Sequence, residues 1–196
     1  MVFDPRVFTQ LVIVDTCSVW NVLSTERLFR AANAAKVTFC ITPMVLYECL
    51  NKPRKSITPE MKTLIQRLIS SRRNGNFQLQ SCDLDDLLAV TRRAPAALSS
   101  GELSCIATAY KITTFAVMTD ERQARQYSEQ KLNLRVETTP KLYGWLHFHR
   151  HLVDSDHKAV IAEHELYERR PLSKFFHEAY ESALQYQLMG REPASR

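Results

Sequence analysis

The chain has few glycines and lacks the glycine-rich loops that cradle phosphates. None of its four glycines follows an apolar run in the GxGxxG or GxxxxGK[ST] spacing, which argues against the nucleotide-binding versions of an α/β fold. The first apolar run ends in Asp15-Thr16-Cys17-Ser18. It lacks the Asp-x-Asp of haloacid-dehalogenase phosphotransferases and the acidic pair of receiver domains. Both of these classes are therefore disfavoured.

Cysteine and long apolar stretches are also scarce. The five cysteines are odd in number, scattered, mostly within apolar runs, and never in a CxxC pair. This pattern indicates reduced core thiols rather than disulfides or a structural zinc site. No apolar stretch approaches the roughly 18 residues of a membrane helix, and the N-terminus lacks a signal-peptide pattern. We therefore expect a soluble, cytoplasmic protein without membrane contact.

Strand and helix signals alternate along the first two thirds of the chain. Apolar, β-branched runs predict strands at residues 11–15, 37–41, 77–82, 115–120 and 134–138. Helical composition and start signals such as Thr42-Pro43 and Thr58-Pro59 predict the helices between them. Those helices are expected at residues 19–36, 43–50, 59–73, 84–93, 102–111 and 121–132. The alternation predicts an α/β fold with a central parallel sheet covered by helices on both faces.

From Pro140 onward the sequence contains only helix signals. Helices are expected at residues 140–151, 154–170 and 173–189. The last one carries an apolar stripe at helical spacing, formed by Phe176, Ala179, Tyr180, Ala183, Leu184 and Leu188. The chain is thus predicted to consist of a domain at residues 1–139 and a C-terminal helical extension, residues 140–196, packed on it.

Acidic residues stand where a metal site could form. Asp15 and Asp120 each end a predicted buried strand, and in open α/β sheets the working crevice lies beyond the carboxyl ends of the strands. With Glu48 and Glu102 they form a set of four carboxylates, which would raise one another's pKa values unless a cation offsets them. Mg²⁺ binds carboxylate oxygens as ligands and keeps bound water, which can act as the nucleophile. The net charge of +5 suits a polyanionic substrate, so metal-dependent hydrolysis is the favoured enzymatic interpretation.

Each acid also has a purely structural explanation. Asp15 and Asp120 could terminate strands and cap the helices that follow. Glu102 stands three residues after Ser99, the spacing of a capping box. Glu48 could be a solvated helix residue.

The motifs around these acids resemble those of the PIN-domain nucleases, and most closely the toxin-type, VapC-like ribonucleases. They are Asp15-Thr16-Cys17 after LVIV, Glu48 in ITPMVLYECL, Glu102 in LSSGELSCIATAY, and Thr119-Asp120 after TFAVM. The resemblance covers about residues 8 to 140 and keeps all four acids in the family's order. Glu102 stands where Asp is common in the family, and the segment after Pro140 is longer than the minimal domain.

The resemblance implies a three-layer fold, Mg²⁺ or Mn²⁺ as cofactor, and a role for each acid. Asp15 would be the central ligand, with Glu102 and Asp120 beside it, while Glu48 would bind a second ion or orient the attacking water. Hydroxyl groups of Thr16 and Thr119 are expected to donate to these ligands. An antitoxin or other inhibitor and a homodimer are the partners it suggests.

Three functions follow from this resemblance. The first is an endoribonuclease acting as a toxin or defence effector under the control of a partner protein. The second is a non-toxic RNA-processing nuclease, and the third is a non-catalytic RNA- or protein-binding module. Full retention of the acids counts against the third. Lys52, Arg54 and Lys55 follow the helix that carries Glu48 and are expected to hold RNA phosphates at the rim of the site, unless they form only a solvated basic loop.

The histidines near residue 150 form a second possible metal site. His147 and His151 have the i, i+4 spacing of a zinc pair. No third ligand is evident nearby, so a zinc site is not favoured.

Overall fold

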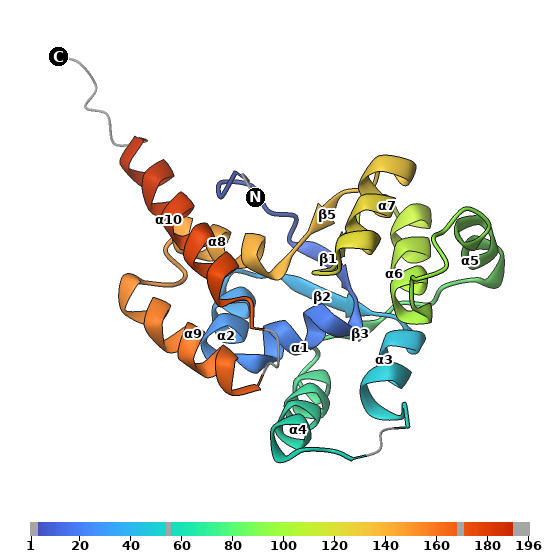
Figure 1. Ribbon diagram of the computed structural model, residues 1–196, viewed down its shortest axis with the longest axis horizontal. Coiled ribbons are helices and arrows are strands. Elements are labelled where there is room, and N and C mark those ends of the chain that lie inside the picture. The colour runs from blue at the N-terminus through green and yellow to red at the C-terminus, as the bar shows by residue number, and fades with distance from the viewer. Residues whose placement is uncertain (1–3, 54–55, 168–170, 190–196) are drawn as a thin grey trace.

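A single parallel sheet forms the centre of the molecule. The computed structural model describes residues 4–53, 56–167 and 171–189 (Figure 1). Within them the five-stranded sheet has the order β3-β2-β1-β4-β5, with every neighbouring pair parallel. The strands are β1 (Leu11–Val14), β2 (Thr38–Ile41), β3 (Gln78–Leu79), β4 (Ala116–Met118) and β5 (Val136–Glu137). Because β1 and β4 are adjacent, Asp15 and Asp120, which follow them, lie at the same edge of the sheet.

Helices cover both faces of the sheet, as expected of parallel strands. They are α1 (Thr16–Ser24), α2 (Glu26–Ala34), α3 (Pro43–Leu50), α4 (Pro59–Arg73), α5 (Leu84–Thr91), α6 (Ser100–Lys111), α7 (Arg122–Leu132), α8 (Thr139–Phe148), α9 (Asp154–Tyr167) and α10 (Ser173–Met189). In Figure 1, α5, α6 and α7 lie on one side of the sheet and α1, α2, α8, α9 and α10 on the other. The predicted α/β fold with a C-terminal helical extension is therefore confirmed.

Local signals account for most element boundaries. Val12, Ile13 and Val14 of β1 are fully buried, as the unbroken apolar run predicted. Thr42 and Thr58 cap α3 and α4 with their hydroxyl groups, and a proline follows each of them in the first turn. Strands β3, β4 and β5 are shorter than predicted, at Gln78–Leu79, Ala116–Met118 and Val136–Glu137.

The prediction of one helix across residues 19–36 was wrong. The chain forms α1 and α2, separated at Thr25, whose backbone is extended (φ −121°, ψ 121°). The Thr25 hydroxyl accepts a hydrogen bond from the backbone N–H of Leu28, 3.0 Å away, and so caps α2. Helix α1 also begins earlier than predicted, at Thr16, because Asp15 caps it. A threonine cap therefore breaks the helix without glycine or proline.

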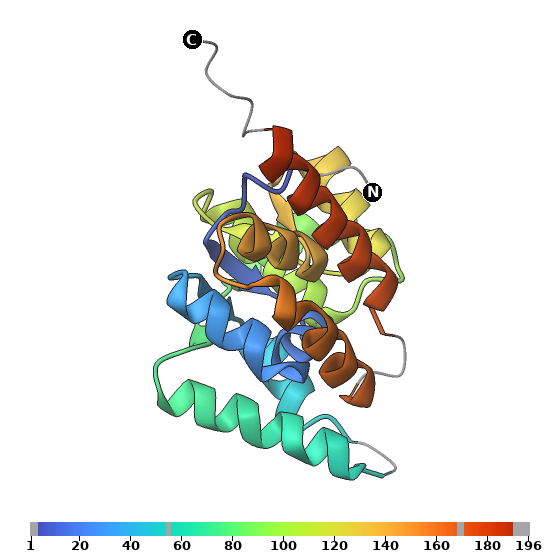
Figure 2. The same cartoon turned by 90° about the vertical axis from the view of Figure 1, so that its left-hand side faces the viewer.

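The C-terminal helices share the hydrophobic core of the sheet domain. Leu142 and Tyr143 of α8, Val160 of α9 and Phe176 of α10 are fully buried and belong to the same cluster as Ile13. Figure 2 shows α8, α9 and α10 on the face that also carries α2. The division of the chain at residues 139 and 140 stays a prediction. Residues 168–170, the predicted end of the α9 helix, lie outside the described residues.

No helix in the described part of the chain combines the length and the apolar character needed to cross a membrane.

A buried histidine links α9 to both α1 and the start of α10. His164 is fully buried; its Nδ1 lies 2.6 Å from Ser24 Oγ, and its Nε2 accepts the backbone N–H of Leu172 at 2.9 Å. Because Nε2 accepts, the proton of the neutral ring is on Nδ1. Burial lowers the pKa of His164 to about 4, so the ring is neutral at pH 7.

We expect His164 to make the fold sensitive to acid. An unfolded histidine binds its proton near pH 6.5, whereas the folded His164 does so only near pH 4. Its contribution to stability is therefore complete above about pH 6.5 and is lost as the pH falls toward 4. In thermal melts, His164→Gln should show a smaller fall in melting temperature between pH 7 and pH 5 than the wild type. An equal fall in both proteins would contradict this assignment.

Candidate active site

Asp15 lies at the buried end of the central strand β1. Its side chain is 1% exposed, and its Oδ1 accepts the backbone N–H of Ser18 at 2.8 Å, which caps α1. Its Oδ2 accepts a hydrogen bond from the Thr119 hydroxyl at 2.5 Å. The capping role proposed as the structural alternative is thus real, and the second carboxylate oxygen faces the end of β4.

Burial makes the charge on Asp15 unfavourable in the protein alone. Desolvation, opposed by the bonds from Thr119 and Ser18 and reinforced by the negative charge of Asp120, raises the pKa of Asp15 to about 7. In the described part of the chain, neither Asp15 nor Asp120 has a Lys, Arg or His within ion-pair distance. A cation placed at this edge would stabilise the ionised form.

Asp120 is held by residues from two helices. Its Oδ2 accepts hydrogen bonds from Ser18 Oγ at 3.2 Å, Asn21 Nδ2 at 2.7 Å and Thr139 Oγ1 at 2.6 Å. The backbone N–H of Thr139 donates to Oδ1 at 2.9 Å. Ser18 therefore contacts both acids, its backbone N–H binding Asp15 and its hydroxyl binding Asp120. This shared residue places the two carboxylates side by side.

Glu48 is buried, so the alternative of a solvated helix residue is wrong. It is 7% exposed, and its Oε2 accepts the Thr16 hydroxyl at 2.5 Å. Its Oε1 accepts Ser100 Oγ at 3.1 Å and the backbone N–H of Gly101 at 3.0 Å, at the start of α6. Thr16 directly follows Asp15, so the Glu48 carboxylate is linked to the same edge of the sheet. The hydroxyl groups of Thr16 and Thr119 thus each donate to a predicted acid, Glu48 and Asp15 respectively.

Because Gly101 has no side chain, the Glu48 carboxylate can pack directly against its backbone. A Cβ atom at position 101 would lie 2.5 Å from Glu48 Oε2 and 2.9 Å from its Cδ. Only a residue without a side chain therefore allows the Glu48 carboxylate to lie against the first turn of α6 in this position.

Glu102 makes the structural contacts of a helix start. Its Oε2 accepts the backbone N–H of Ser99 at 2.6 Å, and Ser99 Oγ accepts the backbone N–H of Glu102 at 3.2 Å. This is the complete capping box. To bind a metal beside Asp15, the Glu102 carboxylate would have to leave Ser99. In this arrangement the described residues contain no group of three or more His, Cys, Asp or Glu side chains positioned to hold a metal ion.

The donor types nevertheless fit a hard divalent cation. Asp15 and Asp120 offer carboxylate oxygens, the ligands that Mg²⁺ and Mn²⁺ prefer. They meet where two adjacent parallel strands end, the usual place for a site in such sheets. The two aspartates could thus bind such an ion together with a further carboxylate, from Glu48 or Glu102.

A cysteine nucleophile is not supported at this edge. Cys17 Sγ lies 3.5 Å from Glu121 Oε1. Desolvation, together with the negative charges of Asp15 and Glu121, raises the pKa of the Cys17 thiol well above its usual range. The thiol therefore stays protonated and is a poor nucleophile.

Of the three residues predicted to bind RNA phosphates, the structure describes one. Lys52 is exposed just after α3, while Arg54 and Lys55 lie outside the described residues. His147 is buried against the rings of Tyr143 and Tyr180, with centroids 4.6 and 4.9 Å away. His151 instead lies beside Trp145, which gives no support to a zinc pair.

Sequence reasoning missed the polar residues that hold the acids. They are Ser18, Asn21, Ser100, Gly101 and Thr139. A signal existed only for Ser18 and Asn21, which stand three and six residues after Asp15, a spacing that places them on one helix face. Thr139 and Ser100 act on acids 19 and 52 residues away, so no local pattern indicates them.

Comparison with known protein families gives a match over most of the chain. A family model described as PIN domain matches residues 11–161, which include all four acids, the whole sheet and the helices as far as α9. No curated protein matches the chain.

Proposed function

The chain belongs to the PIN-domain family, whose members are generally nucleases, and on that premise we propose that it is a metal-dependent endoribonuclease. The observation that carries the proposal is the pair Asp15 and Asp120. The two carboxylates follow adjacent strands, share Ser18, and have no cationic side chain within ion-pair distance in the described chain. Such a pair is stable in its ionised form when it holds a cation.

Asp15 and Asp120 would hold Mg²⁺ or Mn²⁺ between the ends of β1 and β4. When bound, the ion supplies an activated water and stabilises negative charge on the phosphate during hydrolysis. Thr119, Ser18, Asn21 and Thr139 fix the orientation of the two carboxylates through their hydrogen bonds, which keeps the ligand oxygens in place.

Glu48 and Glu102 would complete the site in different ways. Glu48 is already fixed by Thr16 and Gly101 and is suited to orient the attacking water or bind a second ion. Glu102 would join the ligands of the first ion by exchanging its bond to Ser99 for the metal. Its present bond is to the backbone N–H of Ser99, so this exchange would remove one bond of the capping box at the start of α6.

RNA is the proposed substrate, and toxicity under the control of a partner is the proposed role. The overall charge of +5 attracts a polyanion, and Lys52, with Arg54 and Lys55, would extend a basic rim beyond Glu48. The motifs around the acids resemble those of toxin-type ribonucleases, which supports an antitoxin-like inhibitor and a homodimer as partners. Expression in cells should then arrest growth, and co-expression of the inhibitor should relieve the arrest.

Removal of divalent ions should abolish activity. Purified protein is expected to cleave RNA with Mg²⁺ or Mn²⁺, to stop in EDTA, and to recover when the ion is added in excess, because the acids need the cation to act. Mg²⁺ or Mn²⁺ should also raise the melting temperature of the wild type, since an ion that binds only the folded state stabilises it.

Asp15→Asn provides the control for both measurements. It should show neither cleavage nor the rise in melting temperature on addition of the ion. Cleavage that continues unchanged in EDTA would refute the proposed function.

A further inference from the structure

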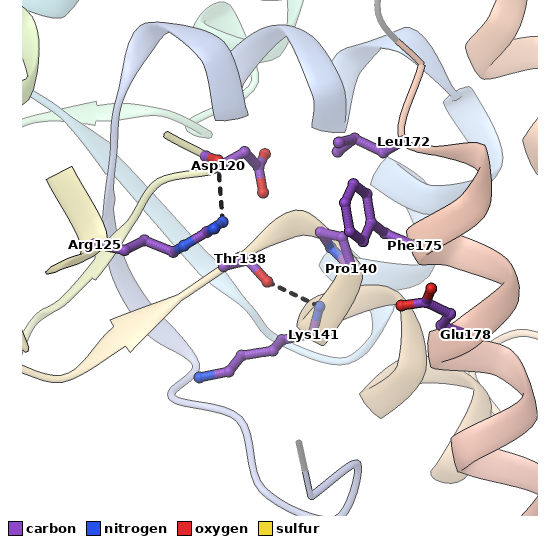
Figure 3. Close-up of a pocket in the computed structure, with 8 residues that line it drawn as sticks. All are labelled: Asp120, Arg125, Thr138, Pro140, Lys141, Leu172, Phe175 and Glu178. Atoms are coloured by element: carbon purple, nitrogen blue, oxygen red, sulfur yellow. Dashed lines mark hydrogen bonds between the residues drawn. The ribbon is translucent and has the colours of Figure 1, made fainter. Parts of the chain in front are cut away.

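A pocket opens beside Asp120. It is formed where α7 and the β5–α8 connection meet the start of α10 (Figure 3). Its lining combines the apolar side chains of Pro140, Leu172 and Phe175 with two basic residues, Arg125 and Lys141, and two acidic residues, Asp120 and Glu178. The carboxylate of Asp120 is thus shared between the proposed metal site and this pocket, so a molecule bound in one is adjacent to the other.

Phe175 provides an aromatic wall that the fold itself does not require. Its side chain is 44% exposed, whereas the adjacent Phe176 is fully buried in the core. Phe176, Ala179 and Ala183 form the face on which α10 packs, and Phe175 lies outside that face. In Figure 3 its ring stands beside Pro140 and below Leu172.

The segment just before Phe175 is held by a hydrogen bond to a buried histidine. The backbone N–H of Leu172 donates to Nε2 of the buried His164, 2.9 Å away. Leu172 stands immediately before α10, so this bond fixes the start of the helix relative to α1 and α9. The aromatic wall is therefore held in position before any ligand arrives, which reduces the entropy lost on binding.

Two cations lie on the opposite side of the pocket from Phe175. Arg125 Nη1 donates to the backbone carbonyl oxygen of Asp120 at 3.0 Å (Figure 3), and Lys141 Nζ donates to the carbonyl oxygen of Val136 at 2.8 Å. The guanidinium of Arg125 keeps four of its five N–H groups for other acceptors, whereas the ammonium group of Lys141 also forms an ion pair with Glu137 Oε2, 3.8 Å away. The remaining guanidinium donors have the chemistry needed to bind a phosphate.

We propose that this pocket binds one unpaired nucleotide of single-stranded RNA, next to the phosphate that is cleaved. The base would stack on Phe175 between Pro140 and Leu172, and the adjoining phosphate would lie beside Arg125. An aromatic face combined with cations is how proteins hold unpaired nucleotides. A base in a duplex is stacked on both faces, so it could not reach the ring. This inference rests on the proposed function, because it makes the pocket part of the substrate path.

The first test measures RNA binding in the cleavage-deficient Asp15→Asn background. With a fluorescent single-stranded RNA of about 12 nucleotides, Phe175→Ala should weaken binding by about 5- to 100-fold, the range expected for loss of one base–aromatic stack. Phe175→Trp should restore it. Tyr110→Ala, which removes another half-exposed aromatic ring outside the pocket, should have no effect. Equal affinity of Phe175→Ala and its parent would overturn the proposal.

The salt dependence separates the roles of the ring and the cations. Arg125→Gln retains a donor for the Asp120 carbonyl group but loses the charge. It should reduce the slope of log K against log salt concentration by about 0.7, the value for one phosphate contact on a single strand. Phe175→Ala should leave the slope unchanged. A slope unaffected by Arg125→Gln would show that no phosphate lies there.

Abasic substitution locates the nucleotide and separates this proposal from the proposed function. When the bases of the RNA are removed one at a time, one position should be found where removal weakens binding to the Asp15→Asn protein. Removal of that base should not weaken binding to the same protein carrying Phe175→Ala.

If the wild type cleaves RNA and Phe175→Ala has the same KM and abasic profile, the pocket assignment fails while the proposed nuclease function stands. If the profile depends on Phe175 but no divalent ion supports cleavage by the wild type, the pocket stands and the proposed function fails. Unchanged RNA affinity together with release of a bound protein by Phe175→Ala would assign the pocket to a protein partner and overturn the proposal.

Discussion

Asp15→Asn should reduce RNA cleavage by roughly 10³-fold or more while leaving the metal-free fold at least as stable as the wild type. Loss of a single preorganised electrostatic contact to a transition state costs 10² to 10³ in rate, and Asp15 is proposed to hold the ion that makes such a contact. The asparagine keeps the shape, and its amide can donate to the Thr119 hydroxyl, which already accepts the backbone N–H of Glu121. The variant thus loses charge with little loss of packing.

The difference in metal-free stability between Asp15→Asn and the wild type should depend on pH. Burial, with the charge of Asp120 adding to it, raises the pKa of Asp15 to about 7 from its ordinary 3.8. Between these values the unfolded chain ionises first, so wild-type stability falls as the pH rises. In EDTA, thermal melts should show the advantage of Asp15→Asn growing from pH 4 to pH 7 and then levelling off.

Asp85→Asn is the matched control, because Asp85 is exposed in the first turn of α5. It should change neither cleavage nor this pH profile. Wild-type cleavage by Asp15→Asn would end the metal-site hypothesis. A marked loss of metal-free stability in Asp15→Asn would contradict the account of Asp15 as a destabilising buried charge.

Gly101→Ala is expected to lower cleavage by about 10- to 100-fold with little loss of stability, the range seen when a supporting contact at a metal site is removed. The added Cβ would lie 2.5 Å from Glu48 Oε2, so the Glu48 carboxylate must move and leave the Gly101 N–H. That carboxylate is the end of a flexible side chain and can give way. Alanine is also favoured over glycine within a helix by about 1 kcal/mol, which offsets part of the disturbance. Steady-state cleavage assays and chemical denaturation measure the two effects.

A double-mutant cycle with Glu48→Ala tests the cause. If Gly101→Ala acts by displacing the Glu48 carboxylate, it should have almost no further effect on cleavage once Glu48 is alanine. Full additivity of the two losses would show instead that Gly101→Ala disturbs the site by another route.

The positions of Asp15 and Asp120 could be predicted because their signals are local. Each follows a short apolar run, and such a run in a parallel sheet is buried along its whole length, as Val12, Ile13 and Val14 are. The carboxyl ends of parallel strands share an edge of the sheet, so the fold class predicted that both acids lie at that edge. That they are neighbours there depends on the adjacency of β1 and β4. The capping box of Ser99 and Glu102 was likewise readable, since it depends on residues three positions apart.

The sequence by itself thus determined the order of the elements, the parallel sheet and the edge where the acids gather, because these depend on local propensity and on side-chain periodicity. Only the tertiary structure decided which side chains hold those acids. Asn21 binds Asp120 across 99 residues of chain, and Gly101 binds Glu48 across 53. Contacts of this kind are fixed by long-range packing, whose partners no local pattern in the chain identifies.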